Sequence, residues 1–340
     1  MHYSTERKKK SSVNIIAVVI VAVLIVVIGL AVFFNWSKII NWFKNGEVDD
    51  EEGANATAKT TDSSEITPIP ATPEPVDPIN FAGDTIETRF NPPAGYERVN
   101  VEAGSFADYL RSFKLKSYGT VAKLADGTDN TEAPTMAVLD LDVRKNGLQQ
   151  CADSIIRLYA EYRYARGEYD YISFDCYTNP VFTMDFSFWT QGNRVQVNGN
   201  KLEWYQPDNA TPGDTSYSTF RYFLDNVFNY ANTYSLKNQM MKIDSSDLQV
   251  GDCLIITADQ TGGTDGHAMI VVDVAVEKST GKKVFMLAEG NTPATEMYVV
   301  EDRNTGSAWF SLNEDGTFSK LTADDRTVTY PLDAFRRFKR

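Results

Sequence analysis

Cysteine and histidine are scarce in this sequence. Among 340 residues there are three cysteines, Cys151, Cys176 and Cys253, and two histidines. Three thiols cannot all pair within one chain, and a chain of this length needs no disulfide framework, so we expect free thiols. The sequence has no His-x-x-x-His motif and no paired-cysteine spacing, which excludes the usual zinc motifs, and it predicts no cofactor.

Positive charge is also in short supply. The chain has 33 lysines and arginines against 46 aspartates and glutamates, a formal net charge of −13. An acidic protein repels phosphate backbones, so nucleic acid is excluded as a partner.

Long hydrophobic runs are rare, and the clearest one lies near the N-terminus. Residues 15–34, IIAVVIVAVLIVVIGLAVFF, contain no charged residue and are long enough to cross a bilayer, which predicts a transmembrane helix over 13–36. Basic residues 7–10 precede it and an acidic stretch follows, so we expect a cytoplasmic tail, 1–12, and an extracytoplasmic remainder held at the cell membrane. A cleaved signal peptide would have a shorter apolar stretch and a small-x-small site, where this chain has Trp36.

The rest of the chain divides into a stalk and a folded domain. Residues 37–80 are acidic and rich in proline and threonine, which is typical of an extended linker. The aromatic content of 12% indicates a real hydrophobic core, and we expect an extracytoplasmic globular domain over 81–340.

Apolar periodicity within this domain predicts helices first and a strand meander afterwards. Helical spacing predicts three helices: one that begins after a cap at Ser105, one over about 148–165, and one over about 219–230 with Ser218 as cap. Strands are predicted over 136–143, 171–177 and 181–186, and consecutive antiparallel strands over 253–258, 267–277 and 283–289. This order is typical of an α+β domain.

A histidine opens one of the predicted strands, directly after the turn TGGTDG. His267 is well placed there for proton transfer, although a partly exposed histidine that only starts a strand is the simpler interpretation. Gly251 and Asp252 open the preceding strand, and the following strand ends at Glu289 and Asn291. This order resembles the second half of NlpC-type cell-wall peptidases and related papain-like amidases. The resemblance implies a papain-like antiparallel sheet with packed helices, His267 as general base, and Glu289 or Asn291 as the residue that orients it.

The nucleophile is less clear from the residues. Cys151 lies in the first turn of a predicted helix, where the helix N-terminus stabilises a thiolate, but a small buried hydrophobe is the commonest role of a free cysteine. Cys176 and Cys253 lie in apolar strands and are predicted to be core residues. Ser218 and Asp252 are further candidates for the site, Ser218 also being a helix cap, and a catalytically inactive relative that only binds is an alternative.

Asp140 and Asp142 project from one face of a predicted strand. Two carboxylates so placed bind a metal or share a proton, or they form a solvated strand face.

A wider resemblance rests on five segments: AVLDLDV at 137–143, LQQCADSIIRLYAEY at 148–162, ANTYSL at 231–236, GDCLI at 251–255 and GHAMIVVDVA at 266–275. In these the chain is similar to the domain of unknown function 4846 family, uncharacterised bacterial envelope proteins. The resemblance implies no established reaction.

Two functions follow as hypotheses. The first is a cysteine-type amidase or peptidase that acts on a cell-wall glycan or peptide. The alternative is an inactive envelope binding or scaffold module, in which Trp189, Trp204, Tyr205 and Trp309 line a groove for a glycan or peptide.

Overall fold

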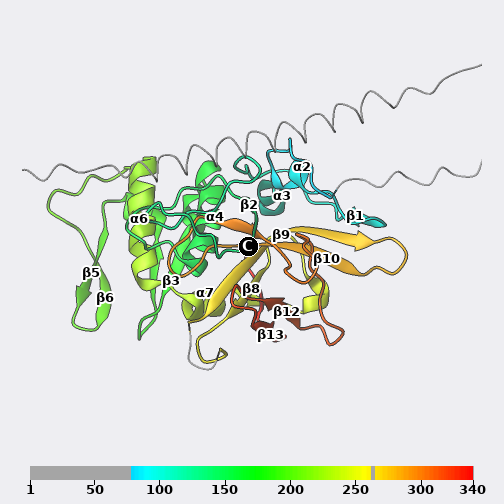
Figure 1. Cartoon of the computed structure of the whole chain (residues 1–340). Coiled ribbons are helices and arrows are strands. Elements are labelled where there is room, and N and C mark those ends of the chain that lie inside the picture. The colour runs from blue at the N-terminus through cyan, green and yellow to red at the C-terminus, as the bar shows by residue number, and fades with distance from the viewer. Residues whose placement is uncertain (1–77, 262–264, 340) are drawn as a thin grey trace, which may run out of the picture. The chain divides into compact units, whose positions relative to one another are not determined.

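The computed structural model describes residues 78–261 and 265–339 (Figure 1). Eight strands form the main sheet: β1 (Tyr96–Arg98), β2 (Thr135–Val138), β7 (Met241–Lys242), β8 (Cys253–Ile256), β9 (His267–Glu277), β10 (Lys283–Glu289), β11 (Tyr298–Val300) and β14 (Phe335–Arg337). The order across the sheet is β2-β11-β10-β9-β8-β14-β7, and β1 pairs with the far end of β9.

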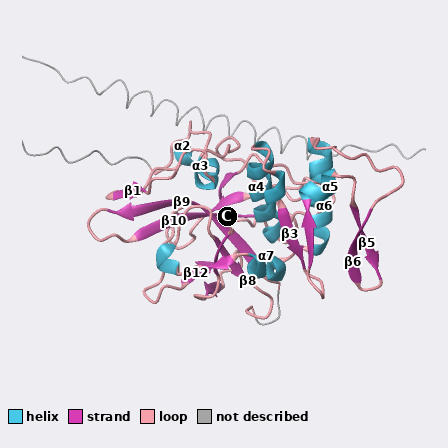
Figure 2. Cartoon of the chain, turned by 180° about the vertical axis from the view of Figure 1, so that it is seen from behind, coloured by secondary structure: helices cyan, strands magenta, loops and turns pink. Residues whose placement is uncertain are grey.

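Three hairpins lie outside this sheet. They pair β3 (Ser173–Cys176) with β4 (Phe182–Asp185), β5 (Arg194–Asn198) with β6 (Lys201–Tyr205), and β12 (Phe318–Leu321) with β13 (Thr327–Tyr330). The helices are α2 (Ile86–Arg89), α3 (Phe106–Arg111), α4 (Cys151–Ala165), α5 (Phe186–Thr190), α6 (Tyr217–Tyr230) and α7 (Thr233–Gln239), with short 3-10 turns at Tyr169–Tyr171 and Ser245–Asp247. Figure 2 shows the β5–β6 hairpin at the end of the domain, near α5 and α6.

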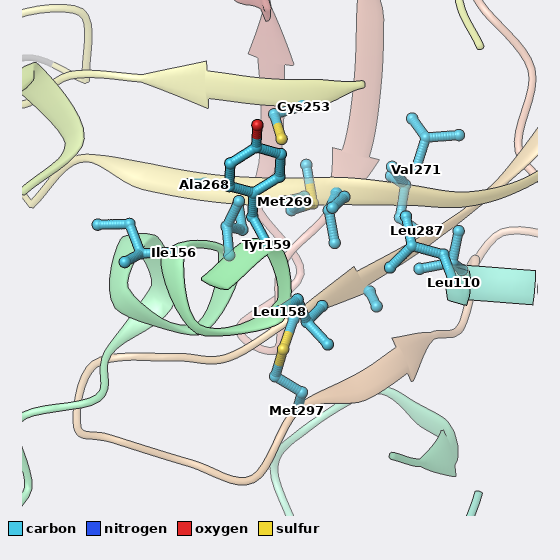
Figure 3. Close-up of a cluster of buried hydrophobic side chains, with 14 of the residues drawn as sticks. Leu110, Ile156, Leu158, Tyr159, Cys253, Ala268, Met269, Val271, Leu287 and Met297 are labelled. Atoms are coloured by element: carbon cyan, nitrogen blue, oxygen red, sulfur yellow. The ribbon is translucent and has the colours of Figure 1, made fainter. Parts of the chain in front are cut away.

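The core lies where α4 packs on β9 and β10. Strand β9 is buried from Ala268 to Ala275, so its sequence is an almost continuous apolar run instead of an alternating one. Side chains of α4, such as Leu158, meet Met269 and Leu287 of the sheet in one cluster (Figure 3). Each fully buried side chain of this size contributes about 1.5–3 kcal/mol to folding.

This architecture corrects the expected fold class. The sequence predicted helices followed by a meander, with a papain-like sheet behind one transmembrane helix. The structure is instead a mixed α/β domain, because β1 and β2, which precede α4 to α7 in the chain, pair with β9 and β11. Backbone pairing between strands so distant along the chain leaves no local pattern in the sequence.

The predicted membrane helix, 13–36, lies outside the described residues, as do the basic tail and nearly all of the stalk. Across 78–261 and 265–339, no helix is both long enough and apolar enough to cross a membrane.

Several local predictions are confirmed and others are shifted. Ser105 caps α3, and β8, β9 and β10 pair consecutively in antiparallel fashion. Ser216, and not Ser218, caps α6, because the helix begins two residues earlier than its apolar face indicates. The strand expected over 136–143 ends at Val138, so Asp140 and Asp142 lie beyond it.

One ion cluster fixes β9 to the segments that cover it. Asp273 is fully buried in β9, and its Oδ2 lies 2.5 Å from Arg98 Nε of β1. Its Oδ1 accepts a hydrogen bond from Arg111 Nε of α3 at 2.8 Å. The carboxylate therefore holds β1 and α3, which come much earlier in the chain, against β9.

We expect Asp273→Ala to lower the free energy of unfolding by about 3–5 kcal/mol, because it leaves two guanidinium groups without their counter-charge. Urea denaturation would measure the change. Asp84→Ala is the control, since Asp84 pairs with Lys114 at 2.6 Å on the surface, where ion pairs contribute little. Equal losses in the two variants would contradict this role for Asp273.

Candidate active site

Cys151 is the first residue of α4, after the cap residue Gln150. Its side chain is nearly buried, with 5% of the residue exposed. Backbone N–H groups in the first turn of a helix have no acceptor within the helix, and the helix dipole places partial positive charge there. A helix of 15 residues thus presents its positive end at this sulfur.

His267 and Glu289 meet at one end of two central strands of the sheet. His267 is the first residue of β9 and Glu289 is the last residue of β10, and the two strands are antiparallel neighbours. His267 Nε2 lies 2.9 Å from Glu289 Oε2. Because Nε2 is engaged by the carboxylate, Nδ1 is the ring nitrogen left for a second partner.

Cys151 lies beside His267, close enough to affect its pKa. Burial opposes the charged imidazolium, but the Glu289 charge and hydrogen bonding to Cys151 and Glu289 outweigh it and raise the pKa of His267 to about 9. The imidazole therefore holds its proton at neutral pH.

Glu289 is held by donors from three other strands. Its Oε2 accepts hydrogen bonds from His267 and, at 2.5 Å, from Lys320 Nζ of β12, and its Oε1 accepts from Tyr298 Oη of β11 at 2.7 Å. Burial alone would raise the pKa of this carboxyl. The charges of Lys320 and His267, with their hydrogen bonds, override burial and hold its pKa far below the usual range.

Two glycines allow the helices to approach these strand ends. Gly290 follows Glu289, and a Cβ there would collide with Ser154 Oγ of α4. Gly266 precedes His267, and a Cβ there would collide with Thr233 Oγ1 of α7 and lie 2.7 Å from the Ile256 carbonyl oxygen. Glycine at both positions lets α4 and α7 lie directly against the ends of β10 and β9.

A pocket of about 330 Å³ opens beside Cys151. Its wall includes Gln150, Asp153, Asn232, Tyr234 and the chain beside His267, with apolar side chains between them. Burial raises the pKa of Asp153 to about 8, against the backbone hydrogen bonds that lower it. A neutral Asp153 leaves the positive end of α4 without a counter-charge two residues from the sulfur.

The structure separates the remaining predicted site residues from this centre. Asn291 donates from Nδ2 to Tyr298 Oη at 3.4 Å and does not bond His267, so Glu289 takes the orienting position. Ser218 is exposed and bonds Ser216 at 3.0 Å. Asp252 is buried against Arg337, with Nε of Arg337 2.6 Å from its Oδ1.

The metal hypothesis for Asp140 and Asp142 is not supported. Asp140 is exposed, and Asp142 pairs with Arg157 and Arg221 at 3.1 and 2.8 Å. The two guanidinium groups already neutralise the Asp142 carboxylate that would have to bind a metal. Within the described part of the chain no cluster of His, Cys, Asp or Glu has a geometry that could hold a metal.

The four aromatic residues expected to line one groove do not all come together. Trp189 and Trp309 are 1% and 7% exposed and belong to the core. Trp204 packs on Trp189, whereas Trp309 donates to the Asn91 carbonyl oxygen in another part of the domain. None of these residues lines the pocket beside Cys151.

The other two cysteines are core residues, as predicted. Cys176 and Cys253 are 1% and 0% exposed. Burial raises the pKa of Cys176 to about 12 and that of Cys253 well above its usual value, so both stay protonated.

Two residues of the site were missed from the sequence. Tyr298 lies in an apolar strand, where a tyrosine is ordinary. Lys320 lies on the same buried face of β12 as Phe318. A lysine at an inward position of a strand could have indicated a buried charge partner.

Comparison with known proteins gives one match. The sequence model of the family described as "Domain of unknown function (4846)" matches residues 86–324, more than half of the chain. No curated protein and no solved structure matches it.

We expect His267 to stabilise the fold below pH 6.5 and to lose this contribution as pH rises through about 9, since its folded-state pKa is raised from 6.5 to about 9. The loss amounts to about 3 kcal/mol. Urea denaturation of the wild type and His267→Gln across this pH range measures it. Asp153, whose pKa is also raised, is present in both proteins, so the difference in their free energies of unfolding reports on His267. A difference that stays constant with pH would contradict the assignment.

Proposed function

This chain belongs to the domain of unknown function 4846 family, and for this member we propose a cysteine-dependent hydrolase of amide bonds. One observation carries the proposal: Cys151 lies beside His267 and lines a pocket, and His267 Nε2 lies 2.9 Å from Glu289 Oε2. Nucleophile, base and orienting group in that order are the arrangement that nucleophilic catalysis requires.

The first half of the reaction uses the charged form of the pair. The Cys151 thiolate attacks the carbonyl carbon of the amide, and the carbonyl oxygen becomes an oxyanion. As the C–N bond breaks, His267 Nδ1 gives its proton to the leaving nitrogen, and an acyl thioester remains on Cys151. Glu289 keeps the ring oriented through Nε2 and stabilises the imidazolium before it transfers the proton.

Backbone groups at the start of α4 supply the stabilisation of the oxyanion. The N–H groups of Cys151 and Ala152 lie in the first turn, where helices leave donors for an anion. Gln150 lines the same pocket, and its Oε1 accepts from Thr292 Oγ1 at 3.1 Å, which leaves its amide nitrogen as a further donor.

The second half uses the neutral form of His267. Nδ1 removes a proton from water, the hydroxide attacks the thioester, and the new carboxylic acid leaves as the thiolate reforms. The proton then resides on His267, so the catalyst is regenerated.

A peptide of the cell wall is the substrate class we propose. Its stems contain amide bonds in an accessible, extended chain, and the pocket combines amide and hydroxyl groups with apolar surface such as Leu148 and Phe228.

We expect iodoacetamide to alkylate Cys151 before Cys176 and Cys253, because burial holds the pKa of both other thiols above neutrality. Peptide mass analysis after limited labelling identifies the modified cysteine. In His267→Gln the labelling should slow, since the thiolate loses its cationic partner. Labelling that is unchanged by His267→Gln would contradict a Cys151–His267 pair.

We expect the full-length protein to release fragments from peptidoglycan, and Cys151→Ala to reduce the rate by about 1,000-fold or more. Cys176→Ala is the matched control, since it removes a core thiol and should leave the rate unchanged. Mass analysis of the soluble products identifies the bond that is cut. Co-sedimentation with the wall without products would indicate a binding module and overturn hydrolysis of this substrate.

A further inference from the structure

Lys320 occupies an unusual place behind the candidate triad. Its Nζ bonds the same oxygen of Glu289, Oε2, that His267 bonds, at 2.5 Å against 2.9 Å. Lys320 is 6% exposed and Glu289 is 2% exposed, so solvent does not screen the pair. A lysine is rarely buried in this way without a partner that needs its charge.

A buried carboxylate has two effects on an adjacent imidazole. It orients the ring, and its negative charge also binds the ring proton more tightly. Hydrolysis through a thioester needs the imidazole to give its proton away and later to work without one, so too strong a hold impedes both steps. A cation on the same carboxylate oxygen reduces that hold.

We propose that Lys320 is a positioning residue that balances the charge of Glu289, so that the carboxylate orients His267 without trapping its proton. This inference rests on the proposed hydrolase and assigns a role to a residue outside the triad. The other titratable groups that face Glu289 and His267 do not supply a cation. They are Cys151 of α4, Tyr298 of β11 and Tyr330 of β13, and burial raises the pKa of both tyrosines well above its usual value.

The fold places Lys320 at this point through the core. Lys320 lies on the same buried face of β12 as Phe318, two positions further on. Phe318 is fully buried, and its ring centroid lies 5.4 Å from that of Phe285 of β10 and 5.6 Å from that of Tyr330 of β13. The β12–β13 hairpin is thus anchored against the strand that ends at Glu289. With Phe318 fixed, the next inward position of β12 delivers its side chain toward that carboxylate.

The test is an NMR titration of His267 in the full-length protein with isotope-labelled histidine. The chain has two histidines, so His267→Gln assigns the signals. We expect Lys320→Met to move the pKa of His267 upward from about 9 by about one unit or more, because a nearby positive charge has been removed. Lys320→Arg keeps the charge and should leave the titration close to that of the wild type.

Two further variants separate charge balance from mere support of the fold. Lys237→Met removes a second buried lysine, whose Nζ pairs with Asp333 at 2.9 Å, and should not move the titration of His267. Lys320→Met should leave the rate of Cys151 alkylation nearly unchanged, whereas the rate of peptide hydrolysis should fall at least tenfold. In the Glu289→Gln background the same substitution should raise the hydrolysis rate, because no charge is left to balance there.

An unchanged or lowered His267 pKa in folded Lys320→Met would overturn the proposal, as would equal effects of this substitution in both backgrounds. The titration and the alkylation need no substrate. A failure to find hydrolysis, with the titration shift present, would therefore count against the proposed function and not against the charge balance.

Discussion

A carboxylate that is 2% exposed loses nearly all of its hydration, and the cost of several kcal/mol is offset only by close donors and opposite charge. At Glu289 those donors come from β9, β11 and β12, and each comes from a different part of the chain. The requirement that all of them meet at the last residue of β10 constrains the rest of the site. It places His267 at the same end of the sheet as the end of β10, brings the β12–β13 hairpin to Glu289, and engages Nε2 of the ring.

The remainder of the domain makes that convergence rigid. Asp273 joins β9 to Arg98 and Arg111, the first of which lies 175 positions away in the sequence, so the strand that begins at His267 is held along its length. Helix α4 is buried from Cys151 to Ala160, polar residues such as Asp153 and Arg157 included. Gly290 then lets its first turn reach the strand end. Packing, and not the site residues themselves, therefore brings Cys151 to the imidazole.

The resemblance to NlpC-type peptidases, and not local sequence alone, pointed to His267 and to Glu289 or Asn291, whereas Cys151 was a candidate from its place at a helix start. Each of Cys151, His267 and Glu289 lies at the boundary of a strongly patterned element. Local sequence failed where contacts are distant. It did not choose between Glu289 and Asn291, because that choice depends on the direction of the chain after β10. It overlooked Lys320, and it gave the wrong fold class because β1 and β2, which precede α4 to α7 in the chain, join the sheet of the later strands. It also placed Trp309 in one groove with Trp189 and Trp204, although Trp309 lies in another part of the domain.

The pairing of Glu289 with Lys320 also raises the question of why a neutral amide is not used instead. A neutral side chain would orient the imidazole without a counter-ion and without the desolvation of two charges. An ion pair offers something an amide lacks: a carboxylate accepts at both oxygens, so it holds His267 and Tyr298 at once while Lys320 cancels its charge. The orienting group is then fixed from three directions. A residue fixed in this way cannot rotate away from His267 when the imidazole changes its charge during a reaction, and a singly bonded amide has no such restraint.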